Sequence, residues 1–142
     1  MTPKEKDLLL KDLCARVPYG VKFNHEGRRT IGKMLSIAPK RTYTSVVYFD
    51  DAINHPKECD MDDIKPYLFP LSSITEEQWK EIADIQAQTS LISLDDDYAH
   101  TMNAPFSLVD LKVIEWCYKN HIDIRNLIPM GLAIDATGLN IY

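Results

Sequence analysis

The N-terminal segment places its apolar residues at the spacing of an amphipathic helix. Four of them fall on one stripe that we expect to be buried, namely Leu9, Leu10, Leu13 and Cys14. The residues Thr2–Glu5 predict where this helix begins, because a threonine cap is followed by proline in the first turn and by glutamate three residues after the cap. Pro18 and Gly20 predict that the helix ends near Arg16.

From Val21 the hydrophobic period changes to the alternation that is typical of β-strands. The expected strands are residues 21–24, 30–37 and 43–49, with one more short strand within residues 59–64. Residues 50–56 are polar, and we expect them to form a connector. Gly32, inside the second strand, indicates a bulge or a tight bend.

The stretch Asp62–Trp79 leads the chain from extended structure back into a helix. Pro66 and Pro70 disfavour helix in the residues that precede them, so we expect an extended or turning backbone there. Thr75 and Gln78 then have the spacing of a capping box, in which each side chain bonds to the other residue's backbone amide. The pattern therefore predicts a helix that begins directly after the threonine.

Two helices are expected in the C-terminal half, at residues 76–88 and 107–120. Their expected apolar faces are Trp79, Ile82, Ala83 and Gln86 on the first helix, and Leu111, Ile114, Cys117 and Tyr118 on the second. The tail, residues 132–142, alternates about a Thr-Gly turn and predicts a closing hairpin.

The order of these elements predicts the α+β class. We expect an N-terminal helix, a small and strongly curved antiparallel sheet that approaches a barrel, and two C-terminal helices packed on the sheet. A chain of 142 residues is expected to form a single domain. Within it, residues 1–71 would form the helix and a basic β part, and residues 72–142 an acidic helical part.

The composition, 45% hydrophobic and 26% charged, is ordinary for a soluble globular protein. No apolar run approaches the roughly 20 residues that span a membrane. The charged N-terminal segment also lacks the apolar block of a signal peptide. The three cysteines (Cys14, Cys59 and Cys117) are widely spaced and indicate reduced thiols. We therefore expect a cytoplasmic protein that does not bind membranes.

The net charge of −5 hides an asymmetry along the chain. Residues 16–48 carry seven basic side chains and one acidic one, whereas residues 49–142 carry 6 basic and 17 acidic side chains. Cations and aromatic rings on a sheet are able to bind single-stranded nucleic acid. The candidates for phosphate contacts are Arg28, Arg29, Lys33, Lys40 and Arg41. The alternative, which the overall negative charge favours, is that these side chains are merely solvated and are balanced by the acidic helices.

The chain carries no motif of a catalytic nucleophile, a phosphate-binding loop or a metalloprotease helix. The acidic run Asp95–Asp97 near His100 is better explained as a solvated loop or a helix cap. His55 and Cys59 lack the further ligands of a structural zinc site. We expect no enzymatic activity, no metal and no cofactor.

Two blocks, Leu9–Lys22 and Asp63–Gln78, resemble a group of small proteins of gut Bacteroidales bacteria that are often encoded in prophages or mobile elements. A looser similarity to the same group covers residues 114–116 and 127–133. The group has no established activity, so the resemblance supplies no catalytic residues. It implies a cytoplasmic, phage-linked accessory protein.

These observations predict a non-enzymatic interaction protein that acts through protein–protein contacts, with nucleic-acid binding as the alternative. Aromatic anchors contribute strongly to interfaces. Tyr67 and Phe69, in the proline-bounded segment, are therefore the candidates for partner binding. The other interpretation of both rings is that they belong to the core.

Overall fold

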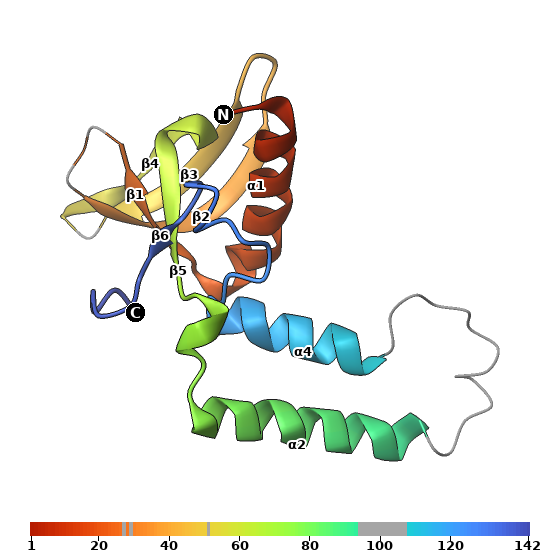
Figure 1. The fold of residues 1–142 in the computed structure, drawn as a ribbon. Coiled ribbons are helices and arrows are strands. Elements are labelled where there is room, and N and C mark those ends of the chain that lie inside the picture. Colours follow the sequence, from red (N-terminus) through yellow and green to blue (C-terminus); the bar gives the residue numbers. More distant parts are fainter. Residues whose placement is uncertain (27, 29, 51, 94–107) are drawn as a thin grey trace.

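The structure is a computed structural model of the chain, and it describes residues 1–26, 28, 30–50, 52–93 and 108–142. Figure 1 shows two bodies, a β part formed by the sheet with helix α1, and a helical arm formed by α2 and α4. The helices are α1 (Pro3–Arg16), α2 (Glu76–Ser93) and α4 (Leu108–Lys119), with short 3-10 turns at Val17–Tyr19, Met61–Asp63 and Leu71–Ser73. The strands are β1 (Lys22–His25), β2 (Ile31–Pro39), β3 (Thr44–Asp50), β4 (Ile53–Asp60), β5 (Ile64–Leu68) and β6 (Ile134–Asp135).

Helix α1 begins and ends where the sequence predicts. The Glu5 amide donates to the Thr2 hydroxyl at 3.2 Å, and the Thr2 amide donates to the Glu5 carboxylate at 2.6 Å, which completes the capping box. The buried stripe, however, differs from the expected one. It consists of Leu9, Asp12, Leu13 and Arg16, whereas Leu10 is half-buried and Cys14 is exposed. The prediction for Cys14 was wrong because a charged pair occupies the buried side of the helix in its place.

The sheet confirms the α+β class and is open. Its pairing order is β4-β3-β2-β1-β5-β6, so β4 and β6 lie at its two ends and the strands do not close into the expected barrel-like form. The five longer strands pair antiparallel, and β6 pairs parallel with β5. The predicted closing hairpin of the tail was therefore wrong, because β6 finds its partner in β5. The expected connector at residues 50–56 also ends early, at Ile53, where β4 begins.

Gly32 marks a close approach between the backbone of β2 and two aromatic rings. A Cβ added there would lie 2.6 Å from the Tyr48 ring and 2.8 Å from the Phe23 ring. These two rings contact each other edge to face, with centroids 5.1 Å apart. The bulge itself lies two residues later, between Met34 and Ser36. Glycine is thus needed for space at this position, and the bulge sits beside it.

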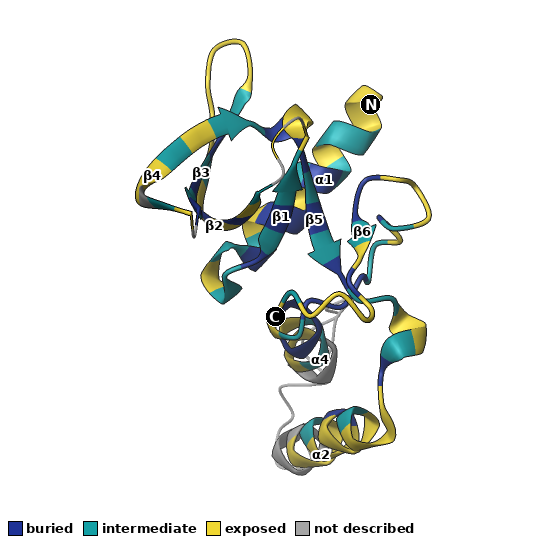
Figure 2. Cartoon of the chain, turned by 90° about the vertical axis from the view of Figure 1, so that its left-hand side faces the viewer, coloured by how far each residue is buried: buried dark blue, intermediate teal, exposed yellow. Residues whose placement is uncertain are grey.

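Helix α1 covers one face of the curved sheet (Figure 2). The core between them contains Leu9, Leu13, Val21, Phe23, Met34, Val46, Tyr48, Met61, Ile64, Leu68, Leu127, Leu132 and Ala133. We call this side of the sheet the inner face. Three of these core residues come from the segment after α4, so the end of the chain closes the core that the N-terminal helix begins.

The helical arm has a smaller core of its own, formed by Ile74, Ile82, Trp116, Cys117 and Ile122. Helix α2 starts with the predicted capping box, in which the Gln78 amide donates to the Thr75 hydroxyl at 3.2 Å. It packs against α4 and not on the sheet, and α4 lies between α2 and the β part in Figures 1 and 2. The expectation that both helices pack on the sheet was therefore wrong for α2. As a result Trp79 is 54% exposed and, on α4, Leu111 is 52% exposed, although both were expected to be buried.

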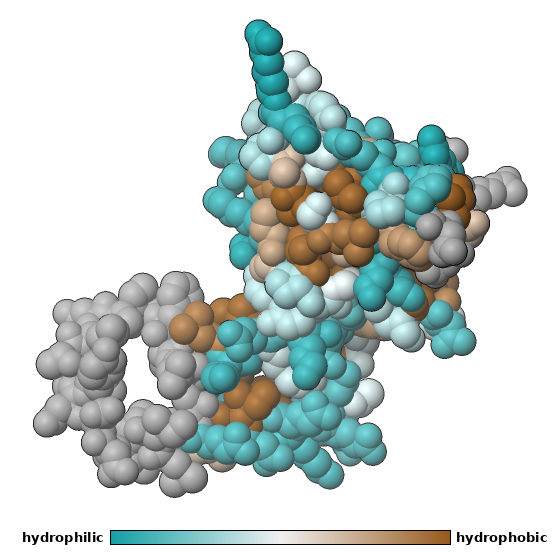
Figure 3. Space-filling model, turned by 180° about the vertical axis from the view of Figure 1, so that it is seen from behind, coloured by the Kyte–Doolittle hydropathy of each residue, from teal (hydrophilic) through white to brown (hydrophobic). Residues whose placement is uncertain are grey.

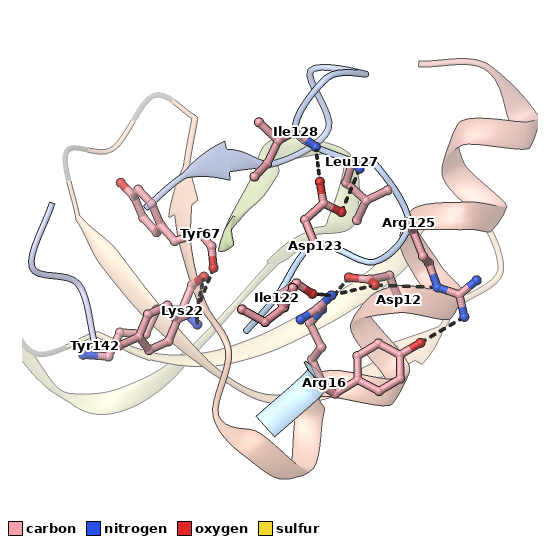
Figure 4. A network of polar contacts seen from close by, with 11 residues as sticks. Asp12, Arg16, Lys22, Tyr67, Ile122, Asp123, Arg125, Leu127, Ile128 and Tyr142 are labelled. Carbon is pink, nitrogen blue, oxygen red and sulfur yellow. Dashed lines mark hydrogen bonds and ion pairs between the residues drawn. The ribbon is translucent and has the colours of Figure 1, made fainter. Parts of the chain in front are cut away.

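A buried ion pair joins the two bodies (Figure 4). Asp12 and Arg16 are both fully buried, and the guanidinium donates to the carboxylate through Nε at 2.6 Å and Nη2 at 3.0 Å. Arg16 Nη2 also donates to the Ile122 carbonyl at 2.7 Å, just beyond α4. Arg125 approaches the same carboxylate at 3.6 Å. The pair thereby fixes the segment after α4 to α1.

Candidate functional site

The sheet has a second face, which we call the outer face, and α1 does not cover it. Residues directly opposite one another in an antiparallel pair project from the same side, and so do residues two apart along a strand. The register pairs Lys33 with both Lys22 and Phe49, and Asn24 with both Ile31 and Lys65. On β4 the register likewise pairs Val47 with Glu58 and Phe49 with Pro56. The outer face therefore carries Lys22, Asn24, Ile31, Lys33, Leu35, Ser36, Ser45, Val47, Phe49, Pro56, Glu58, Asp60, Lys65 and Tyr67.

Apolar side chains occupy much of this face. Ile31 is 38% exposed and Leu35, at the bulge, is 45% exposed, while Val47 and Phe49 are half-buried. Figure 3 shows hydrophobic side chains gathered on the side of the β part that faces away from the viewer of Figure 1. The uncovered face of an antiparallel sheet is ordinarily polar. A contiguous group of exposed apolar residues with polar residues at its border is typical of an interaction site.

Three lysines lie among these apolar residues, on adjacent strands. Lys33 is exposed, and its side chain packs against Gly20. A Cβ added at Gly20 would lie 2.7 Å from the Cε atom of Lys33. The Lys22 ammonium donates to the carbonyl of Ile141 at 2.8 Å. The Lys65 ammonium lies 3.3 Å from the Glu26 carboxylate. Glu58, opposite Val47, is exposed, and its carboxylate accepts from the Tyr43 and Ser45 hydroxyls. The outer face thus combines apolar surface with charges of both signs, and two of its three lysines already have partners in the chain.

The two predicted anchor residues have different surroundings. Tyr67 is half-buried and lies on the outer face, two residues after Lys65. Phe69 is also half-buried, but its ring packs against the core of the helical arm. Its amide donates to the His121 carbonyl at 2.9 Å, and its carbonyl accepts from the Asp123 amide at 2.8 Å. Phe69 therefore has a structural role, and partner binding by either ring stays a prediction.

The last residue, Tyr142, forms one border of the outer face. Its hydroxyl lies between β1 and β5, where it accepts from the Lys22 amide and donates to the Tyr67 carbonyl, both at 2.9 Å. Its ring stacks on His121 with centroids 3.7 Å apart. Burial raises the pKa of Tyr142 to about 12 and lowers that of His121 to about 4. The phenol and the imidazole are thus both neutral near pH 7.

The predicted phosphate-binding residues do not gather in one patch. Arg28 lies before β2, and Lys40 and Arg41 lie after it, and all three are exposed. Because β2 has nine residues, these two groups are separated by about 25 Å of strand. Of the described candidates, Lys33 is the one on the outer face, and Arg29 lies outside the described residues. Among the other cations of residues 16–48, Arg16 is removed from the surface altogether by its burial.

Burial disfavours the thiolate form of two of the three cysteines. Burial raises the pKa of the Cys59 thiol to about 12 and also raises that of Cys117, so neither forms a thiolate readily. Within the described ranges no group of three or more His, Cys, Asp or Glu side chains is placed to hold a metal ion. The acidic run Asp95–Asp97 and His100 lie outside those ranges.

The sequence interpretation missed Leu35 and Phe49 as surface residues, although a signal was present. Positions 46–49 are four successive apolar residues, so β3 has no polar side. Such a strand is usually buried on both faces. Here Val46 and Tyr48 enter the core, while Val47 and Phe49 face outward.

Comparisons of the chain with known proteins found no significant match. None of the described helices combines the length and the apolar character that crossing a membrane requires. No protein-family model matches the chain, no curated protein is significantly similar to it, and no solved structure matches its fold significantly.

Proposed function

We propose that this chain is a non-enzymatic accessory protein whose outer face binds a protein partner. The observation that carries the proposal is the group of uncovered apolar residues formed by Ile31, Leu35, Val47 and Phe49. Covering such a group removes apolar area from water, and full burial of one leucine contributes about 1.5–3 kcal/mol. A cytoplasmic, phage-linked role belongs to the same proposal, and the resemblance of residues 9–22 and 63–78 to Bacteroidales mobile-element proteins supports it.

The proposal also predicts the chemistry of the contact. Leu35 at the bulge is the most exposed apolar residue of the face, so we place it at the centre of the interface. Lys33 lies beside it on the same strand and favours a carboxylate at the edge of the partner's apolar segment. Tyr67, on β5, would contact the partner at the far side of the face. Of the two partner-binding residues predicted from the sequence, Tyr67 is the one that this proposal retains.

Quantitative affinity capture from a gut Bacteroidales host tests this proposal. The wild-type chain is compared with Leu35→Glu, which places a carboxylate within the apolar group. The matched control is Met130→Glu, because Met130 is 42% exposed but lines a hollow beside α1 with Met1 and Glu5. We expect at least one host or phage protein to be captured by the wild type and the control but not by Leu35→Glu. If Leu35→Glu captures the same proteins in the same amounts, the outer face is not the contact surface.

Binding of single-stranded nucleic acid to the same face is a second candidate function. The observation that favours it is the register, which places Phe49, Lys33 and Lys22 side by side across three strands. Rings and cations in such a row are able to stack on bases and contact phosphates. The net charge of −5 and the existing partners of Lys22 and Lys65 act against it.

A salt series of gel shifts with single-stranded and duplex probes decides on this second function. If the face binds nucleic acid, affinity falls steeply with salt and Lys33→Glu abolishes it, whereas Lys4→Glu on α1 leaves it unchanged. The double variant Arg28→Ala/Arg41→Ala reports on the two ends of β2. Absence of any shift at low salt would remove nucleic acid from consideration.

A further inference from the structure

A hollow lies where three segments of the chain meet. They are residues 69–78, which lead from β5 into the first turn of α2, residues 119–122 at the end of α4, and residues 137–142 in the tail. The hollow has a volume of about 490 Å³, which is within the range of sites for small molecules. No residue of the outer face lines it, so it is a separate feature of the surface.

The imidazole of His121 lines this hollow without a hydrogen-bond partner. The residue is 8% exposed, and its Nδ1 is enclosed and unpaired among the described residues. No hydrogen bond to Nε2 is present in the described part of the chain either, and Nε2 is the ring nitrogen that stays accessible. A neutral imidazole has one N–H, and enclosed unpaired N–H groups are rare in proteins. We therefore place the proton on Nε2, which then offers a donor to the hollow.

Lys119 sets the charge of the hollow. It is the one charged side chain among the described residues that line the hollow, it is exposed, and it forms no ion pair with another described residue. Arg16 and Lys22 add positive potential at the imidazole, where they disfavour its protonation. The start of α2 and the end of α4 both border the hollow, so their helix dipoles oppose each other there. The side chains therefore decide the sign of the charge, which is positive.

Two aromatic rings form another part of the lining. Phe69 and Tyr142 both line the hollow, with ring centroids 6.0 Å apart and an angle of 50° between the ring planes. Tyr142 also stacks on His121, which holds the imidazole in place. A carboxylate or phosphate group alone fills only a small part of such a volume. The rings offer the remainder to an apolar or aromatic body.

We propose that this hollow binds a small organic anion. Its carboxylate or phosphate accepts hydrogen bonds from His121 Nε2 and from the Lys119 ammonium, which are both donors. Its apolar body packs against Phe69 and Tyr142. This inference goes beyond the proposed function and does not depend on it, because the ligand is a small molecule and the hollow lies off the outer face.

The first test is an NMR titration of the isotope-labelled full chain with phenyl phosphate. The imidazole Cε1–H signal of His121 and the backbone amide signal of Lys119 shift together and saturate. Inorganic phosphate binds at least about tenfold more weakly, because it leaves the rings uncovered, and phenol binds more weakly as well, because it lacks the oxyanion. Benzoate in a parallel titration shows whether a carboxylate or a phosphate is preferred.

The second test uses variants of the lysine. Lys119→Gln removes the cation and weakens binding of phenyl phosphate by about tenfold, whereas Lys119→Arg keeps the charge and keeps most of the affinity. The matched control is Lys112→Gln, because Lys112 is an exposed lysine on the same helix that does not line the hollow. Lys112→Gln and the outer-face variant Leu35→Glu bind like the wild type. Circular dichroism of each variant confirms that it is folded.

Three outcomes overturn this inference. The first is a His121 signal that neither phenyl phosphate nor benzoate moves at millimolar concentration. The second is equal affinity of Lys119→Gln and Lys112→Gln for phenyl phosphate. The third is phenol or inorganic phosphate binding as tightly as phenyl phosphate, because the oxyanion or the apolar body would then not be recognised. None of these outcomes affects the proposed function, which depends on whether Leu35→Glu loses a captured protein.

Discussion

Removing the carboxylate of Asp12 should be among the most destabilising single changes in this chain. Asp12→Ala leaves the Arg16 guanidinium fully buried without its counter-charge, since two hydrogen bonds at 2.6 and 3.0 Å are lost together. Breaking a buried ion pair from one side typically costs about 3–5 kcal/mol. That is a large share of the roughly 5–15 kcal/mol by which a domain is stable. For a chain of this size the melting temperature should fall by about 10–20 °C.

Urea unfolding followed by far-UV circular dichroism measures this loss. The matched control is Asp7→Ala, which breaks a pair with Lys11 on the same helix at the same four-residue spacing. That pair is more than 60% exposed on both sides, so its loss should cost less than about 1 kcal/mol. The two pairs therefore share a helix and a spacing and differ in burial.

The double variant Asp12→Leu/Arg16→Met separates charge from packing. Replacing both members of a buried pair with apolar residues is often close to neutral. The Ile122 carbonyl loses its donor at 2.7 Å in this variant, so a loss of about 1–3 kcal/mol remains. The double variant should therefore be more stable than Asp12→Ala. If Asp12→Ala lowers the free energy of unfolding by less than about 1 kcal/mol, the reasoning is refuted, because burying an unpaired guanidinium should be far more unfavourable.

Three further predictions concern packing, pH and thiol reactivity. Gly32→Ala should cost about 1–3 kcal/mol in urea unfolding, because its Cβ would lie 2.6 Å from the Tyr48 ring. Burial and two nearby cations lower the pKa of His121 from 6.5 to about 4. Between these two pH values the imidazole is protonated in the unfolded chain and neutral in the folded chain. Stability should thus fall by up to about 3 kcal/mol as pH drops from about 6.5 to about 4. His121→Asn, which suits the left-handed backbone at φ 59, should remove that loss in pH-dependent melting curves. At about pH 8, mass spectrometry of the labelled chain should find the exposed Cys14 modified well before Cys59, whose pKa burial raises to about 12. Equal labelling rates would contradict the burial of Cys59.

Signals that act over a few residues were readable in the sequence. The capping boxes at Thr2 and Thr75 both form as predicted, because their hydrogen bonds lie within one helical turn. Pro66 indeed lies in extended backbone, within β5. The α+β class follows from the same local periodicities.

Features that depend on distant residues were not readable. Asp12 and Arg16 have the spacing of an ordinary surface ion pair, and only the packing of residues after α4 buries them. The parallel pairing of β6 with β5 was not readable either, because Ile134–Asp135 carries no strong strand pattern of its own. The exposure of Trp79 depends on α2 packing on α4, whereas a helical pattern alone does not tell which side is covered.

The candidate site was only partly predicted for the same reason. Tyr67 and Lys33 were named from the sequence and both lie on the outer face. Leu35 and Phe49 were missed, because the side of a strand that faces solvent is decided by where α1 packs and by the bulge after Met34. Their partner-binding role remains a proposal.

Hydroxyl-radical footprinting of the chain, alone and bound to its captured partner, tests the central claim most directly. Oxidation of each side chain reports its exposure in both states. The outer-face account predicts that Leu35 and Phe49 become several-fold less reactive in the complex, while Met130 beside α1 keeps its rate. A complex in which Leu35 and Phe49 react as in the free chain, with protection elsewhere, would contradict it.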